Sequence, residues 1–108
     1  MNQQRLKQLF DFLKDDPNDP FLLYAIATEY GEENATEALK YYDKLLTEHP
    51  SYFATYYHAA ALLAEIEEIE RAREVYLKGI EVCKEAGEAK ALQEIQNAYQ
   101  NFLFEYDE

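Results

Sequence analysis

Few side chains in this sequence have the types and spacing that chemistry requires. Asp15, Asp16 and Asp19 form a group of carboxylates, and carboxylate oxygens are ligands that calcium prefers. Their loop, DDPNDP, lacks the glycine and the downstream glutamate of an EF-hand. Its two prolines push the residues before them out of helical geometry. We therefore expect a helix-breaking turn at this loop, and no metal site.

His58 and Cys83 are the remaining candidates for chemistry. A histidine with an ordinary pKa near ~6.5 can change charge in a cell, but no convergent set of titratable groups accompanies His58. Cys83, the one cysteine, has no partner for an intrachain disulfide. It shares a helix face with Tyr76 and Ile80, so we expect a small buried hydrophobe. No phosphate loop, nucleophile elbow or zinc spacing is present. The sequence therefore predicts a protein that binds no cofactor and is not an enzyme.

The charge balance narrows the class of partner. The 108 residues, one domain's worth, carry a formal net charge of −12. Such a chain repels phosphate backbones and anionic membranes, so we expect no nucleic acid and no membrane partner. A basic or neutral peptide fits better, although the charge can also serve solubility alone. We expect a cytoplasmic protein for three reasons. The chain has a single cysteine, it lacks the apolar run of a signal peptide, and it has no apolar stretch of ~20 residues.

Six helical segments must position these side chains. Apolar residues recur at helical spacing throughout, and no segment alternates with period two, so the predicted class is all-α. Asp19 before Pro20, and Asn34 with Glu37 three residues on, predict helix starts. Gly87 predicts a helix end. The expected helices are residues 3–14, 20–30, 35–48, about 52–65, about 68–85 and about 88–105.

The segment ATEALKYYDKLLTEHP (35–50) returns in altered form as IERAREVYLKGIEVCK (69–84). The positions that recur 34 residues apart are Ala38 and Ala72, Tyr42 and Tyr76, and Leu45 and Gly79. The preceding helices match at an offset of 33. One helix pair cannot bury its apolar face alone, but stacked copies bury it against one another.

This pattern resembles the tetratricopeptide repeat family over roughly residues 17–84. The residues that carry the resemblance are Leu23, Ile26, Ala27, Tyr30, Ala38, Tyr42 and Pro50 in one unit, and Tyr56, Ala59, Ala60, Ile69, Ala72, Tyr76 and Gly79 in the next. The resemblance implies a short right-handed superhelical stack of antiparallel helix pairs forming one domain. Its parts would be an N-terminal capping helix (3–14), repeats 17–50 and 51–84, and a C-terminal capping helix (88–105).

The family usually binds peptides in a concave groove lined by the first helix of each unit. Carried over by position, the groove residues here would be Tyr24, Thr28, Tyr57, His58, Ala61, Glu65, Gln93, Asn97 and Gln100. Some members instead grip acidic C-terminal tails with Lys, Arg and Asn. The matching places hold Tyr24, Thr28, His58, Lys90 and Glu94. Only Lys90 fits, so we expect no such clamp.

Two functions remain in competition. The first is a protein–protein interaction module that binds a segment of another protein, with Tyr24, Tyr57, His58, Gln93 and Asn97 as anchors. The second is a structural, self-associating homo-oligomer. Phe12, Phe104 and Tyr106 lie partly off the predicted core faces near the chain ends and motivate the second. Coverage by the neighbouring terminal helices is the alternative for these three side chains.

Overall fold

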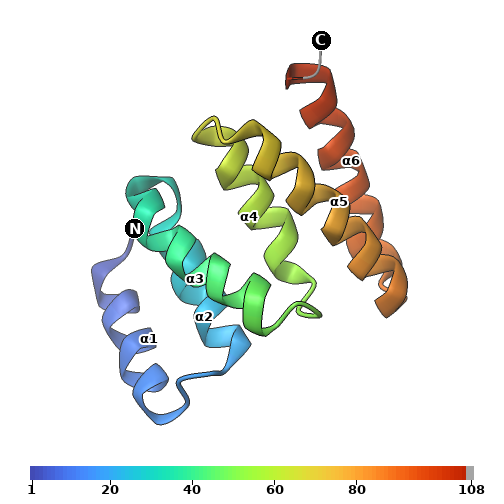
Figure 1. The fold of residues 1–108 in the computed structure, drawn as a ribbon. Helices are drawn as coiled ribbons and strands as arrows, with labels where there is room; N and C mark the ends of the chain where they lie inside the picture. The colour runs from blue at the N-terminus through green and yellow to red at the C-terminus, as the bar shows by residue number, and fades with distance from the viewer. Residues whose placement is uncertain (107–108) are drawn as a thin grey trace. The chain divides into compact units, whose positions relative to one another are not determined.

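The computed structural model describes residues 1–106, and within that range every regular element is a helix (Figure 1). In chain order the elements are α1 (Gln3–Asp15), α2 (Pro20–Tyr30), the 3-10 helix η1 (Gly31–Asn34), α3 (Ala35–Glu48), α4 (Ala54–Glu65), α5 (Ile69–Ala86) and α6 (Ala89–Tyr106). The all-α prediction is confirmed. Several helix bounds differ from those expected by one or two residues, and residues 31–34, expected as a plain turn, form a turn of 3-10 helix.

The helix ends follow the capping residues that the sequence predicted. The Asp19 carboxylate accepts a hydrogen bond from the Phe21 backbone N–H at 2.9 Å, with Pro20 at the first helical position. The Asn34 side chain accepts one from the Glu37 backbone N–H at 3.3 Å and starts α3. Gly87 ends α5 with φ of 70°, a left-handed conformation that favours glycine.

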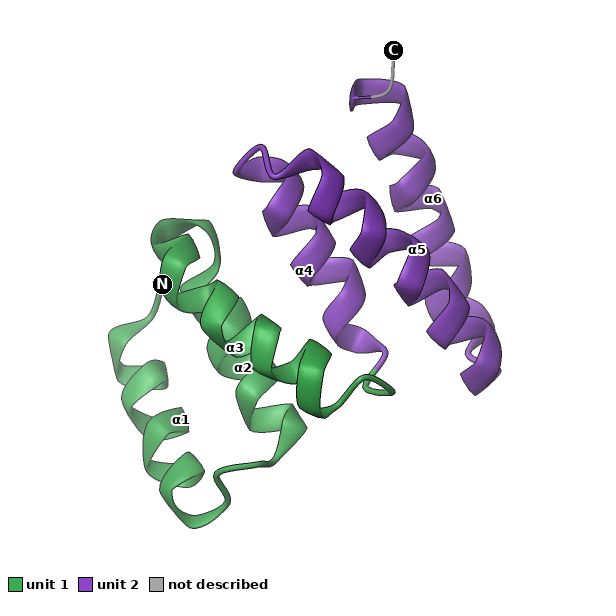
Figure 2. Cartoon of the chain, viewed as in Figure 1, with its two compact units in different colours: residues 1–52 green, residues 53–108 purple. Residues whose placement is uncertain are grey.

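The chain divides into two compact units (Figure 2). Unit 1 spans Met1–Tyr52 and contains α1, α2 and α3. Unit 2 begins at Phe53 and contains α4, α5 and α6. The single domain of two repeats and two capping helices that the resemblance implied stays a prediction.

Unit 1 buries the apolar faces that the periodicity assigned to its helices. The buried side chains are Leu6 of α1, Leu23, Ile26 and Ala27 of α2, and Ala38, Tyr42 and Leu45 of α3. A second aromatic layer surrounds this core. The Phe10 ring lies 6.4 Å from that of Tyr30 and 6.1 Å from that of Tyr41, between centroids. Edge and offset contacts of this kind add to the stabilisation from burial.

Unit 2 has a core that draws on all three of its helices. The buried side chains are Thr55, Tyr56, Ala59, Ala60, Leu62, Leu63 and Ala64 of α4, Ala72, Val75, Tyr76, Val82 and Cys83 of α5, and Ile95 and Phe102 of α6. Cys83 is 2% exposed, which confirms the prediction of a small buried hydrophobe. Burial raises the pKa of its thiol above the ordinary value of 9.0.

Gly79 is the point at which the three helices of unit 2 meet. A Cβ atom placed on this residue would lie 2.5 Å from Ile95 Cδ1 and 2.5 Å from Tyr56 Cβ. Gly79 therefore permits close approach of the last helix. Helix α4 presses on the same spot through Tyr56. A residue without a side chain is therefore required on α5 at this level.

We expect Gly79→Ala to lower the free energy of unfolding by up to about 2 kcal/mol. Alanine gains ~1 kcal/mol of helix propensity, but two atoms must move to admit its methyl group, and overpacking costs ~1–3 kcal/mol. Urea denaturation measures the net change. Lys78→Ala, on the exposed side of the same helix, is the matched control and should change stability little. A Gly79→Ala protein more stable than wild type would refute the account of this contact.

Candidate binding site

Potential metal ligands do not gather into a site in the part of the chain that the structure describes. No group of three or more His, Cys, Asp or Glu side chains that could hold a metal occurs in residues 1–106. The Asp19 carboxylate, part of the acidic loop, is engaged in capping α2. None of the described helices is both long enough and apolar enough to cross a bilayer. Each unit has a surface hollow of its own.

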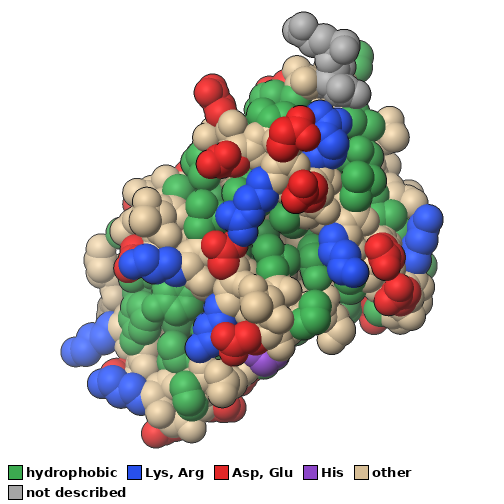
Figure 3. All heavy atoms as spheres, in the orientation of Figure 1, with side chains coloured by type: hydrophobic (Ala, Val, Ile, Leu, Met, Phe, Trp, Pro, Cys, Tyr) green, Lys and Arg blue, Asp and Glu red, His purple; other side chains and the backbone are tan. Residues whose placement is uncertain are grey.

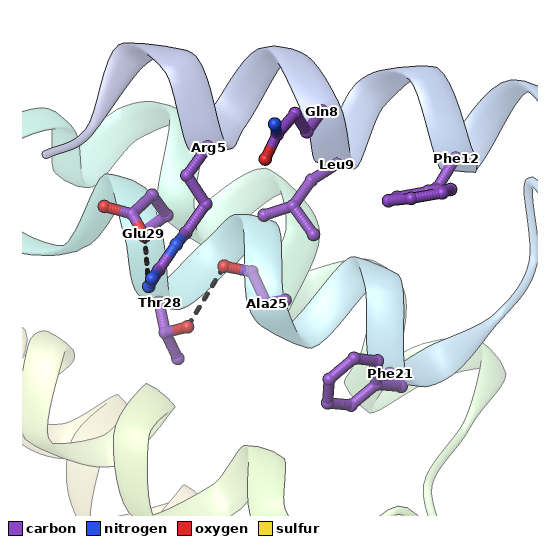
Figure 4. A pocket seen from close by; sticks show the side chains of 8 residues that line it. All are labelled: Arg5, Gln8, Leu9, Phe12, Phe21, Ala25, Thr28 and Glu29. Atoms are coloured by element: carbon purple, nitrogen blue, oxygen red, sulfur yellow. Dashed lines mark hydrogen bonds and ion pairs between the residues drawn. The ribbon is translucent and has the colours of Figure 1, made fainter.

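The hollow of unit 1 lies between α1 and α2 and has a volume of about 340 Å³ (Figure 4). Its lining residues are Arg5, Gln8, Leu9, Phe12, Phe21, Ala25, Thr28 and Glu29. Figure 4 shows Phe12 and Phe21 at one end, with Arg5 and Glu29 at the other. The apolar end is open, since Phe12 is 61% and Phe21 58% exposed.

The polar side chains at the other end of this hollow already have partners within unit 1. Arg5 Nη1 lies 3.5 Å from Glu29 Oε1, which neutralises both charges. The Thr28 hydroxyl donates to the Ala25 carbonyl of its own helix at 3.1 Å. The unit 1 hollow therefore offers apolar contact area and little free charge.

The hollow of unit 2 lies among α4, α5 and α6 and has a volume of about 240 Å³. Its lining residues are Tyr57, Ala61, Ala64 and Glu65 of α4, Tyr76 of α5, and Ala98, Asn101, Phe102, Glu105 and Tyr106 of α6. Small residues on α4 and α6 form the space, and aromatic rings form its walls.

The aromatic wall of this second hollow is a connected cluster. The Phe102 ring lies 5.2 Å from that of Tyr76 and 5.3 Å from that of Tyr106, between centroids. Tyr99 packs behind it, 6.1 Å from Phe102 in a stacked arrangement. Partial burial raises the pKa of Tyr76 above its ordinary value of 10.0, and the neighbouring phenols of Tyr57 and Tyr106 raise it further. Mutual packing of this kind holds the rings in fixed positions.

The predicted groove residues are exposed or half-buried, and the structure groups only some of them. Tyr57, Ala61 and Glu65 line the unit 2 hollow, and Thr28 lines the unit 1 hollow. Tyr24 is half-buried with its ring 5.8 Å from that of Tyr52. The predicted residues of α6, which are Gln93, Asn97 and Gln100, are exposed and do not line either hollow.

The side of α6 that lines the hollow is a different one. Ala98, Asn101, Phe102 and Glu105 follow the i, i+3, i+4, i+7 spacing of one helix face. That face lies about a third of a turn from Gln93, Asn97 and Gln100, at 3.6 residues per turn. The signal in the sequence was the combination of a small, an amide, an aromatic and an acidic residue at this spacing. Its meaning depends on how α6 is rotated against α5.

Charged side chains do not gather by sign on the face of the molecule in Figure 3. Acidic and basic groups alternate there, with hydrophobic side chains between them, in both units. The net charge of −12 is therefore not concentrated on that face. The charged residues that line each hollow differ between the two units.

Comparison with solved structures identifies the class. The chain is similar to a solution NMR structure of a tetratricopeptide repeat domain protein from Salinibacter ruber, with 39% identity, a TM-score of 0.75, and coverage of 81% of this chain and 89% of that one. A crystal structure of a tetratricopeptide repeat domain protein from the same organism gives 37% identity, a TM-score of 0.74, and coverage of 79% and 96%. No protein-family model matches the chain, and no curated protein does.

The pairs of antiparallel helices and their recurring small residues define a helical repeat protein. With these two relatives, the chain belongs to the tetratricopeptide repeat family. The family generally mediates protein–protein interaction, and its fold is typically a non-enzymatic scaffold.

His58 follows Tyr57 on α4, and its imidazole lies 5.3 Å from the Tyr57 ring between centroids. The residue is exposed overall, but partial desolvation of the ring lowers its pKa below the ordinary value of 6.5. Desolvation thus opposes the surplus of carboxylates in the chain, which would favour the charged imidazole.

We expect the imidazole of His58 to titrate with a midpoint below 6.5, measured from its ring-proton shifts by NMR. The unfolded chain binds this proton first as the pH falls. The contribution of His58 to stability is therefore present above pH 6.5 and is lost between 6.5 and the lower folded-state value. The unfolding free energy of His58→Asn should not show that component. A midpoint at or above 6.5 would mean that the carboxylates outweigh desolvation.

Proposed function

We propose that this chain is a non-enzymatic interaction module that binds a peptide or protein segment, with the hollow of unit 2 as its main contact. One observation carries the proposal. Tyr57, Ala61 and Glu65, which the family resemblance assigns to the partner side of α4, line one hollow together with α6. A preformed hollow with packed aromatic walls binds without paying for its own ordering.

The lining residues suit recognition of a peptide. Tyrosine supplies a large contact area at low entropy cost, and Tyr57 is 42% exposed. The Asn101 amide can donate to and accept from a peptide backbone. The other predicted groove residues, Tyr24, Thr28, His58, Gln93, Asn97 and Gln100, are proposed to contact parts of the segment outside the hollow. The acidic chain favours a basic or neutral partner over nucleic acid.

Ala61→Leu should weaken peptide binding at least tenfold, which is ~1.4 kcal/mol. Ala61 is exposed on α4, and leucine is a good helix former, so the change should fill the hollow without unfolding the protein. Peptides are first selected from a random display library on the wild-type chain. Their affinities for both proteins are then measured by calorimetry.

Ala86→Leu is the matched control for this experiment. Ala86 is an exposed alanine at the end of α5 and does not line the hollow, so this variant should bind like wild type. Equal affinity of wild type and Ala61→Leu would rule out the hollow as the contact. A selection that yields no specific peptide would count against the function itself.

Self-association is the second candidate function, and Phe104 favours it. This side chain is 94% exposed on the last turns of α6, so the neighbouring helices do not cover it. Tyr106, by contrast, lines the unit 2 hollow and is half-buried. An exposed phenylalanine can insert into an apolar hollow of another copy.

If copies associate through Phe104, sedimentation velocity will show a mass that grows with concentration, and Phe104→Gln will return the monomer. Exposed positions tolerate such changes, so folding should be unaffected. Leu77→Gln is the matched control, because Leu77 is another exposed apolar side chain. This variant should associate like wild type. A monomer at all concentrations would exclude self-association.

A further inference from the structure

The two hollows both have apolar walls but differ in charge. In unit 1 the one carboxylate of the hollow, Glu29, is paired with Arg5 at 3.5 Å. In unit 2 the hollow has two carboxylates, Glu65 and Glu105, and no basic residue in its lining. Neither of these two takes part in an ion pair within the described part of the chain. The unit 2 hollow therefore has two negative charges that no basic residue of its lining balances.

The fold brings these two carboxylates to the same end of unit 2. Glu65 is the last residue of α4, and Glu105 is one before the end of α6. Figure 1 shows α4 and α6 running in the same direction, so their carboxyl ends lie at the same end of the unit. The two carboxylates thus flank a space whose walls are Tyr57, Ala61 and Phe102.

The pKa of the Tyr106 phenol is sensitive to the negative charges around the hollow. Partial burial raises its pKa above the ordinary value of 10.0, and the negative charges of Glu105, Glu65 and Glu67 raise it further. The same carboxylates that oppose ionisation of a phenol attract a cation.

The aromatic wall is suited to a cation as well. The guanidinium carbon of Arg73 lies 5.6 Å from the centre of the Phe102 ring, so this ring already takes part in one cation–π contact. Arg73 is itself close to Glu70, at 3.9 Å, and does not line the hollow. The exposed ring of Tyr57 offers a further face.

We propose that the unit 2 hollow receives one basic side chain of the partner, a lysine or arginine. Its aliphatic stem lies along Ala61 and the rings of Tyr57 and Phe102, and its cationic head is held between Glu65 and Glu105. This inference rests on the proposed function and names the chemistry of the partner at that site. An acidic side chain is repelled there, and an apolar one leaves the carboxylates partly desolvated without a partner.

Single amino-acid derivatives test the hollow without any knowledge of the partner. The probes are Nα-acetyl-lysine methylamide and the matching arginine derivative, titrated to millimolar concentration against the full chain. Ring resonances of Tyr57, Phe102 and Tyr106 are followed by NMR. We expect saturable shifts with both basic probes. The norleucine derivative, with a similar stem and no charge, and the glutamate derivative should give none.

The double variant Glu65→Gln/Glu105→Gln should weaken binding of the basic probes at least tenfold. Glu85→Gln/Glu94→Gln removes the same charge from exposed positions of α5 and α6 outside the hollow, so it should leave binding unchanged. Circular dichroism confirms that both double variants fold. Equal binding of norleucine and lysine, or equal weakening by the two double variants, overturns the proposal.

Display-selected peptides separate this inference from the function on which it rests. In each peptide that Ala61→Leu weakens, the basic residues are replaced singly by norleucine. We expect one position where the replacement loses at least tenfold on wild type but little on Glu65→Gln/Glu105→Gln. Peptides that need the hollow but no basic residue would overturn the inference and leave the function standing. Binding of the basic probes with no peptide selected would support the charge preference of the hollow and reject the function.

Discussion

Close approach of helices at residues with little or no side chain is the constraint on which both units depend. Ala27 and Ala38 in unit 1, and Ala60 and Ala72 in unit 2, are fully buried. At Gly79 the approach is so close that a single methyl group would overlap atoms of both flanking helices. The larger side chains can interdigitate only because these positions let the backbones come near. Dense packing of this kind leaves little room for the helices to slide or rotate.

The unit 2 hollow is a consequence of the same packing. Contact of Gly79 with Tyr56 and Ile95 places α4 and α6 on the same helix, α5, and α4 and α6 also touch one another. Further along, Ala61 and Ala98 are too small to fill the space between these two helices. The aromatic cluster around Phe102 then closes the sides. The hollow thus arises from small residues at two levels of the helices, which permit contact at one level and leave space at the other.

The two units show how one architecture can offer different surfaces. Each unit has a hollow between its helices, and aromatic side chains line it. An internal ion pair neutralises the hollow of unit 1, whereas that of unit 2 keeps two carboxylates. The pairing of charges within each hollow therefore distinguishes the two hollows, and the net charge of −12 for the whole chain does not reveal this difference. Specificity in a helical repeat can change through such substitutions without any change in the core.

The sequence by itself determined the helices, their ends and the family. The 3.6-residue periodicity and the caps at Asp19 and Asn34 are local properties of the chain, and the structure agrees with both. Tertiary structure alone decided which side of α6 faces the hollow. Ile95 and Phe102 are buried against neighbours far away in the sequence, and their burial sets the rotation of the helix. Gln93 and Glu105 are both polar residues of one amphipathic helix, so periodicity could not tell which of them would lie beside α4.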